Sequence, residues 1–134
     1  MADFNFELVS PERLLLSEQV SEVVIPATDG EMTVMANHAP TMTTIKPGVV
    51  TVKSSSGKTD RYVVFGGFAD IIPTGCTLLA ESALHIDEVS KDDFAKRIEV
   101  ARAELDNAVG DENKSRLEQY LGQLTDLNGI VMPA

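Results

Sequence analysis

The chain has 134 residues, 43% of them hydrophobic, which is enough for one ordinary domain, or a small domain with an appendage, around a real core. Its 21 acidic and 11 basic residues give a formal net charge of −10. That charge argues against nucleic acid as a partner, because nucleic-acid-binding proteins neutralise phosphates with Lys and Arg. It also argues against direct docking on an anionic membrane surface, and it leaves a basic protein partner open.

The single cysteine, Cys76, excludes an intramolecular disulfide, which suits a reducing compartment. We expect Cys76 to be a small, buried hydrophobic residue. The start of the chain lacks the pattern of a signal peptide, and the longest apolar run, from Tyr62 to Ala69, is too short to span a bilayer. If the protein works at a membrane, another protein therefore holds it there.

Residues 1–86 have the pattern of short strands separated by turns. Phe4, Phe6 and Leu8 alternate with polar residues, which is typical of a half-buried strand. From Glu31 onward we expect a return strand on which Met32 and Val34 face the same way. The series predicts an antiparallel β-sandwich or barrel. The expected turns or bends are Asp29-Gly30, Lys46-Pro47-Gly48, Gly66-Gly67 and Pro73-Thr74-Gly75.

Residues 87–134 have the pattern of helices. Ser90 and Asp93 have the spacing of a capping box, and a break is expected at Gly110-Asp111. A second helix is predicted over 112–128, with Gly129 as the residue that follows its end. Two amphipathic helices joined by a short turn predict an antiparallel hairpin. The apolar stripe of the first helix consists of Phe94, Ile98, Ala101, Leu105 and Ala108.

The sequence contains no constellation of residues typical of an enzyme. His38 and His85 are the only histidines, so a histidine-rich metal site is excluded, and the common phosphate-binding and nucleophile motifs do not occur. We therefore predict no catalytic residues, no metal site and no cofactor. His38 has two interpretations: it is a loop residue hydrogen-bonded to the backbone, or it contacts a partner.

The segment from Gly30 to Pro40, GEMTVMANHAP, followed by Ile45-Lys-Pro-Gly48, resembles the epsilon subunits of bacterial-type rotary ATP synthases. The mitochondrial counterpart is called delta. Further matches are Val9-Ser10-Pro-Glu, Gly66-Gly67-Phe68 and the segment 78–83. The resemblance implies a mainly β fold: an antiparallel β-sandwich of about ten strands over 1–86, followed by a two-helix hairpin over 87–134.

The resemblance also implies a function and its residues. Members of this family are non-catalytic central-stalk subunits that couple the membrane c-ring to the gamma subunit during ATP synthesis. They sit on the cytoplasmic side of the bacterial plasma (inner) membrane, attached only through the complex. His38 matches the gamma-facing histidine, with Ser10 and Thr43 near the same face. The ring-facing loop is Asp29-Gly30-Glu31, with Met42 nearby.

Two departures from the family bear on the hairpin. Relatives that bind ATP have an acidic residue and an arginine where Ser90 and Asp93 stand, so we predict no nucleotide binding. An alternative function is inhibition of ATP hydrolysis through contacts of the hairpin with the catalytic alpha and beta subunits. Lys114 and Arg116 stand against three acidic residues in the second helix, which disfavours that alternative. An unrelated binding module and an enzyme are weaker alternatives still.

Overall fold

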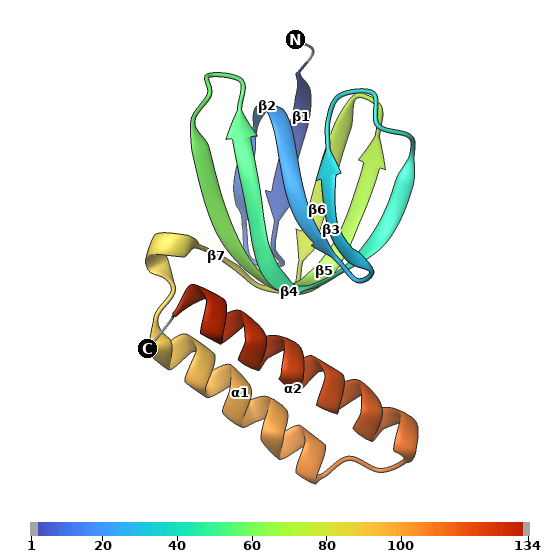
Figure 1. Ribbon diagram of the computed structural model, residues 1–134, viewed down its shortest axis with the longest axis vertical. Helices are drawn as coiled ribbons and strands as arrows, with labels where there is room; N and C mark the ends of the chain where they lie inside the picture. The colour runs from blue at the N-terminus through green and yellow to red at the C-terminus, as the bar shows by residue number, and fades with distance from the viewer. Residues whose placement is uncertain (1–2, 133–134) are drawn as a thin grey trace. The chain divides into compact units, whose positions relative to one another are not determined.

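The computed structural model describes residues 3–132. The chain divides into two units, Met1–Ile86 and Asp87–Ala134, and each is described by itself (Figure 1). The first unit contains the strands β1 (Phe4–Val9), β2 (Leu14–Ala27), β3 (Gly30–Val34), β4 (Thr41–Ser54), β5 (Thr59–Ile72), β6 (Gly75–Ala80) and β7 (Ala83–His85). A 3-10 turn, η1 (Ile86–Glu88), is followed by the helices α1 (Lys91–Asp106) and α2 (Asp111–Val131).

The strands form one sheet that closes on itself. Its order is β1-β6-β5-β4-β2-β3, and β1 also pairs with β2, so five strands form a ring. β7 pairs with β5 outside that path. The prediction of a β-rich first half followed by two helices is confirmed. The predicted antiparallel arrangement has one exception, because β1 and β6 run parallel. The long stretch of chain between them provides the crossover that parallel pairing requires.

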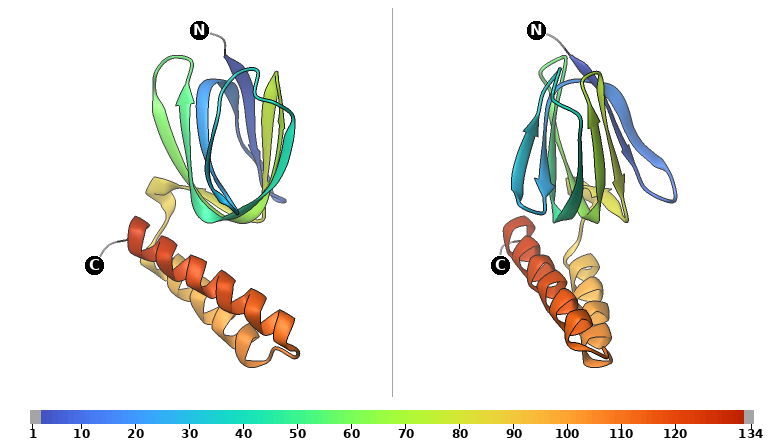
Figure 2. Two further views of the ribbon diagram at one scale, coloured as in Figure 1. Left: turned by 45° about the vertical axis from the view of Figure 1, so that its right-hand side comes forward. Right: turned by 90° about the vertical axis from the view of Figure 1, so that its right-hand side faces the viewer.

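Three strands of 14 residues, β2, β4 and β5, bend and pass from one layer of the sandwich to the other (Figure 2). The predicted turn at Lys46-Pro47-Gly48 is wrong, because β4 continues through it while Pro47 and Gly48 stay paired with β5. In β5 the bend falls at Gly66-Gly67, where both φ angles are positive. Long, bent strands explain why the structure has seven strands where the resemblance implies about ten.

The core follows the alternation that the sequence predicts. Phe6 and Leu8 of β1 are fully buried, while the residues between them are partly exposed. On β3, Val34 is buried and Met32 packs against the core from the same side, which confirms the predicted orientation. Cys76 is also buried, as predicted. Every buried side-chain nitrogen and oxygen of the described residues has a hydrogen-bond partner, as is usual in native proteins.

The helical unit is an antiparallel pair whose first helix begins at the predicted capping box. The Ser90 hydroxyl accepts a hydrogen bond from the Asp93 N–H at 3.2 Å, and the Asp93 carboxylate accepts from the Ser90 N–H at 2.9 Å. The predicted apolar stripe of α1 is buried or half-buried along its length. The predicted helix end at Gly129 is wrong: α2 continues to Val131, and the Met132 N–H closes its last turn on the Asn128 carbonyl.

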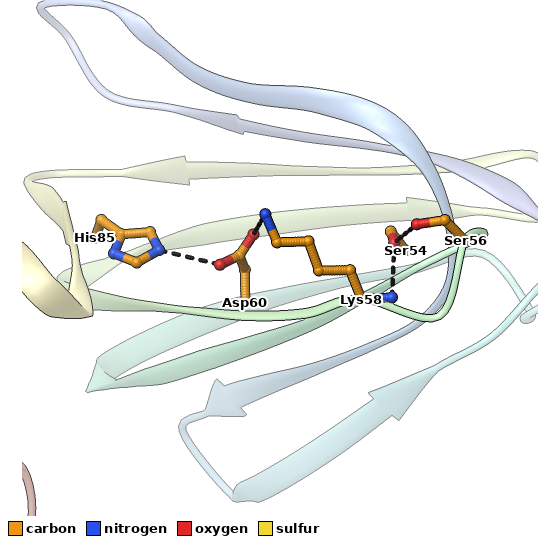
Figure 3. A network of polar contacts seen from close by, with 5 residues as sticks. All are labelled: Ser54, Ser56, Lys58, Asp60 and His85. Carbon is orange, nitrogen blue, oxygen red and sulfur yellow. Dashed lines mark hydrogen bonds and ion pairs between the residues drawn. The ribbon is translucent and has the colours of Figure 1, made fainter.

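A polar network fastens the short strand β7 to β5 (Figure 3). His85 Nε2 donates to an Asp60 carboxylate oxygen at 3.1 Å, and Lys58 Nζ lies 4.0 Å from the other oxygen. The edge of the His85 ring also faces the Tyr62 ring, with centroids 5.2 Å apart. Ser54 and Ser56 complete the turn before β5 by bonding to each other, and Ser54 also accepts from the Lys58 N–H. The last strand of the sandwich is therefore held by polar contacts as well as by its ladder.

We expect Gly67→Ala to destabilise the sandwich by about 3 kcal/mol or more. A Cβ at Gly67 would overlap the Leu79 carbonyl oxygen, and φ there is +149°. The matched control is Gly57→Ala, where φ is +91° but nothing lies within 4 Å, so only backbone strain of about 1 kcal/mol is expected. Chemical denaturation of both variants measures the difference. Equal losses would show that the close approach at Gly67 is unimportant.

A second prediction concerns the capping box and pH. The N–H and hydroxyl of Ser90 bond to the Asp93 carboxylate and hold the pKa of Asp93 below its ordinary value. The stabilisation is therefore present at neutral pH and is lost as the pH falls through the lowered folded-state pKa. Ser90→Ala should cost the helical unit about 1 kcal/mol at neutral pH and less in strong acid. Amide hydrogen exchange in the first turn of α1 measures this, with Ser115→Ala in α2 as the control that should not be destabilising.

Candidate functional site

His38 lies in the loop between β3 and β4, and its own backbone environment fixes its ring. Asn37 has a φ of +66°, and its N–H donates to the Pro73 carbonyl at 2.9 Å, which ties the loop to the turn between β5 and β6. His38 Nδ1 lies 2.8 Å from the Ala39 carbonyl oxygen. Only a protonated nitrogen can bond to a carbonyl, so Nδ1 carries the proton and Nε2 of the neutral ring is an acceptor. The geometry matches the interpretation as a loop histidine, and it also orients Nε2.

The Asp29 turn stands at the other end of β3 from the His38 loop (Figure 1). Five residues of strand separate them, which corresponds to about 16 Å. Asp29 and Glu31 are exposed, and the Thr28 N–H donates to the Thr44 carbonyl at 3.1 Å. The turn therefore lies beside β4. Met42 is two residues from Thr44 on the same side of that strand, so the structure places it near the turn.

Ser10 lies at the end of the sandwich opposite to His38. It begins the turn between β1 and β2, where its N–H donates to the Arg13 carbonyl at 2.9 Å. The start of β1 adjoins the His38 loop, because the Asn5 N–H donates to the Thr74 carbonyl, one residue after the Pro73 carbonyl that holds Asn37. Ser10 and His38 therefore lie at opposite ends of β1, which runs its full six residues between them. The expectation that both belong to the gamma-facing face stays a prediction.

The Thr43 side chain lies on the inner side of its strand and is partly exposed. It stands in register with Ala69, Leu78 and Leu8, all three of which are fully buried. Side chains alternate along a strand, so the neighbouring Met42 points outward, where it is 65% exposed. Met42 is therefore the more accessible of the two to a partner on the outside of this layer, and a gamma contact of Thr43 stays a prediction.

The outward side of this layer is a surface that the sequence analysis did not find. We call it the outer face, formed by the outward residues of neighbouring segments of β4, β5, β6 and β1. Besides Met42, it exposes Leu79 (50%) and Ile72 (49%). Three apolar side chains gathered on one sheet face are typical of a protein-binding surface. Residues that are in register on neighbouring strands form three rows across this face. The rows are Met42–Asp70–Thr77–Glu7, Thr44–Phe68–Leu79–Val9 and Ile72–Gly75–Asn5.

A hollow of about 330 Å³ opens on the outer face. Gly75 has no side chain to fill the space between Asn5 and Ile72, with which it is in register. Glu7 and Asp70 also line the hollow. Cys76 is also among the lining residues, although its side chain belongs to the core. Burial and then the charge of Asp70 raise the pKa of its thiol to about 12, so this thiol remains protonated and unreactive. The outer face could be recognised from the sequence only if the pairing register of all four strands were known, because its residues come from distant parts of the chain.

Among residues 3–132, no group of three or more His, Cys, Asp or Glu side chains could hold a metal ion. Within the same range, neither α1 nor α2 is long and apolar enough to cross a bilayer.

Comparison with known proteins identifies the family. A family model described as "ATP synthase, Delta/Epsilon chain, beta-sandwich domain" matches residues 3–86. The chain is 72% identical over 131 residues to the "ATP synthase epsilon chain" of Rhizobium meliloti (strain 1021), covering 98% of this chain and 97% of that one. It is 72% identical over 132 residues to the protein of that name in Rhizobium etli, covering 98% of each.

Solved structures agree. A chain of the Euglena gracilis mitochondrial ATP synthase (OSCP/F1/c-ring) superimposes with a TM-score of 0.74 at 27% identity, covering 98% of this chain and 82% of that chain. A chain of the Tetrahymena thermophila mitochondrial ATP synthase (central stalk/c-ring), at a TM-score of 0.61 and 12% identity, shares the fold. The resemblance read from the sequence is thus confirmed, and the chain belongs to the family of ATP synthase delta/epsilon chains.

Proposed function

We propose that the chain is a non-catalytic central-stalk subunit of a bacterial proton-translocating ATP synthase, and that it couples the c-ring to the gamma subunit during ATP synthesis. The relatives named ATP synthase epsilon chain and the c-ring assembly from Euglena support this. The side chains best suited to catalysis have other roles. Cys76 is buried and protonated, His38 Nδ1 is bonded to a carbonyl, and His85 is bonded to Asp60.

The gamma subunit is the proposed occupant of the outer face and the adjoining His38 loop. The observation that carries this proposal is that Met42, Ile72 and Leu79 lie on one side of the sheet, all about half exposed or more. Met42, which the resemblance implies near the ring-facing loop, is here assigned to the gamma contact instead. Burying apolar side chains of this size supplies most of the affinity in protein interfaces. His38 Nε2, oriented by the bond at Nδ1, would accept a hydrogen bond at the edge of that contact.

The c-ring is the proposed partner of the Asp29 turn. Asp29 and Glu31 are exposed carboxylates at the end of β3 far from the His38 loop. A coupling subunit has to hold two partners at once, so its two contacts cannot share the same residues. The outer face adjoins the turn at Thr44, so the c-ring contact is assigned to Asp29 and Glu31 alone. Exposed carboxylates at a rim contribute orientation more than affinity. Through these contacts the chain would be held peripherally on the cytoplasmic side of the bacterial plasma membrane, without lipid contact of its own.

The alternative function, inhibition of ATP hydrolysis by the hairpin, has one observation in its favour. Val109 and Ile130 are 83% and 74% exposed, and Val100 is also exposed, so the helical unit has apolar side chains that a catalytic alpha or beta subunit could bury. The acidic charge of the helical unit disfavours this alternative function. The Asp93 carboxylate at the start of α1 would repel a triphosphate, so any such regulation would act without nucleotide binding to the chain.

We expect Met42→Asp to weaken gamma binding at least about tenfold, because a charge would replace an apolar contact at the proposed interface. The matched control is Val100→Asp, another exposed apolar residue, which should leave gamma binding unchanged. Affinity is measured with purified gamma subunit. A cysteine introduced at Met42 should also cross-link to gamma, and Cys76 can stay because its thiol is buried. Unchanged affinity for Met42→Asp would contradict this placement of gamma.

Truncation after Ile86 tests which unit carries the function. The sandwich has its own closed core, so residues 1–86 should still assemble with the enzyme and support ATP synthesis at close to the full rate. ATP synthesis and hydrolysis are measured in membranes complemented with either form. Loss of assembly would contradict the assignment of coupling to the sandwich, whereas a severalfold rise in ATP hydrolysis would favour the inhibitory hairpin.

A further inference from the structure

None of the contacts proposed for the outer face uses its hollow, and the residues that line the hollow suggest a role for it. Resting on the proposed function of the outer face, we propose that the hollow receives a Lys or Arg side chain of the gamma subunit, held between Glu7 and Asp70. Its volume of about 330 Å³ is at the small end of ligand pockets. It suits one long side chain with some water.

The register places two carboxylates on opposite sides of the hollow. Glu7 of β1 and Asp70 of β5 are both in register with Thr77 of β6, one on each side of it. Two strand spacings separate their backbones by about 10 Å. A cation between them can therefore approach both carboxylates at once. An Arg guanidinium suits this best, because its planar group donates hydrogen bonds in several directions.

The negative charges of Glu7 and Asp70 have no basic side chain opposite them within the outer face. None of the eleven residues in its three rows is basic. Among the described residues, Lys58 and His85 both pair with Asp60, and neither pairs with Glu7 or Asp70. Complementary charge would therefore have to come from the partner.

The apolar surroundings of the hollow suit a basic residue better than a free metal ion or a small cation. Ile72 lines the hollow, and Met42 stands next to Asp70 in the same row. Lys and Arg cover apolar surface with their aliphatic stems while the charged end meets a carboxylate. A partner segment with one basic residue among apolar neighbours would therefore match both the charge and the apolar side chains of the outer face.

The test measures the affinity of the full-length chain for purified gamma subunit at low and high salt. Glu7→Gln and Asp70→Asn remove charge while keeping size, so both variants should fold, which thermal unfolding checks. The double variant should lose at least about tenfold in affinity, and the salt dependence of binding should become shallower. Asp70→Lys should lose more. Glu22→Gln, a strand carboxylate in register with Lys53 in the other layer, is the matched control and should bind like the wild type.

The outcomes separate this inference from the proposed function. If Met42→Asp weakens binding while the Glu7→Gln, Asp70→Asn double variant keeps wild-type affinity and salt dependence, gamma docks on the outer face and the basic side chain in the hollow is refuted. If the double variant loses no more affinity for gamma than Glu22→Gln does, the basic side chain in the hollow is also refuted. If the wild-type chain does not bind gamma at all, both the proposed function and the inference fail.

Discussion

The closure of the sheet by β1 is the constraint on which the rest of the molecule depends. β1 pairs with β2 on one side and with β6 on the other, which completes the ring of five strands. Without it, β2 and β6 would have open edges of the kind that aggregate. Its alternation also decides which residues face where, because Phe6 and Leu8 point into the core while Glu7 points outward. A slip of one residue would exchange the two sets and lose both the core and the hollow.

A closed sheet is also a suitable body for transmitting force between two partners. The Asp29 turn and the His38 loop are held at the two ends of β3, and each is tied by a backbone hydrogen bond to another strand or turn. Sites on such rigid elements keep their geometry better than sites on long loops. A contact at one end would therefore move together with a contact at the other, as the proposed coupling role requires.

The sequence predicts the parts of the fold that depend on neighbouring residues. The alternation of β1 and the capping box of Ser90 and Asp93 are local patterns, and both are confirmed. The mistaken turn at Pro47-Gly48 arose because a turn signal was read without the tertiary pairing that keeps β4 continuous there. Gly129 was also misread as the end of a helix. A glycine inside a helix costs only about 1 kcal/mol, so α2 continues through it to Val131.

The candidate site was harder to predict, because it depends on the register of strands that are distant in sequence. Whether Met42 or Thr43 faces a partner is decided by their pairing with Asp70 and Ala69, which no local pattern reveals. The hollow requires Gly75 to meet Asn5, seventy positions earlier in the chain. The resemblance supplied the names of residues near the site but not the side of the strand on which each lies.

Charge and apolar area have separate tasks on the proposed interfaces. Exposed carboxylates such as Asp29 and Glu31 are solvated, so their attraction to a partner is modest and screened by salt. Apolar side chains such as Met42 and Leu79 give affinity with little directional preference. A carboxylate beside a hollow differs from both, because a docked partner displaces the water around it and strengthens its interaction with a cation. On this reasoning the apolar side chains of the outer face would hold the partner, and Glu7 and Asp70 would fix the one register in which the partner can dock.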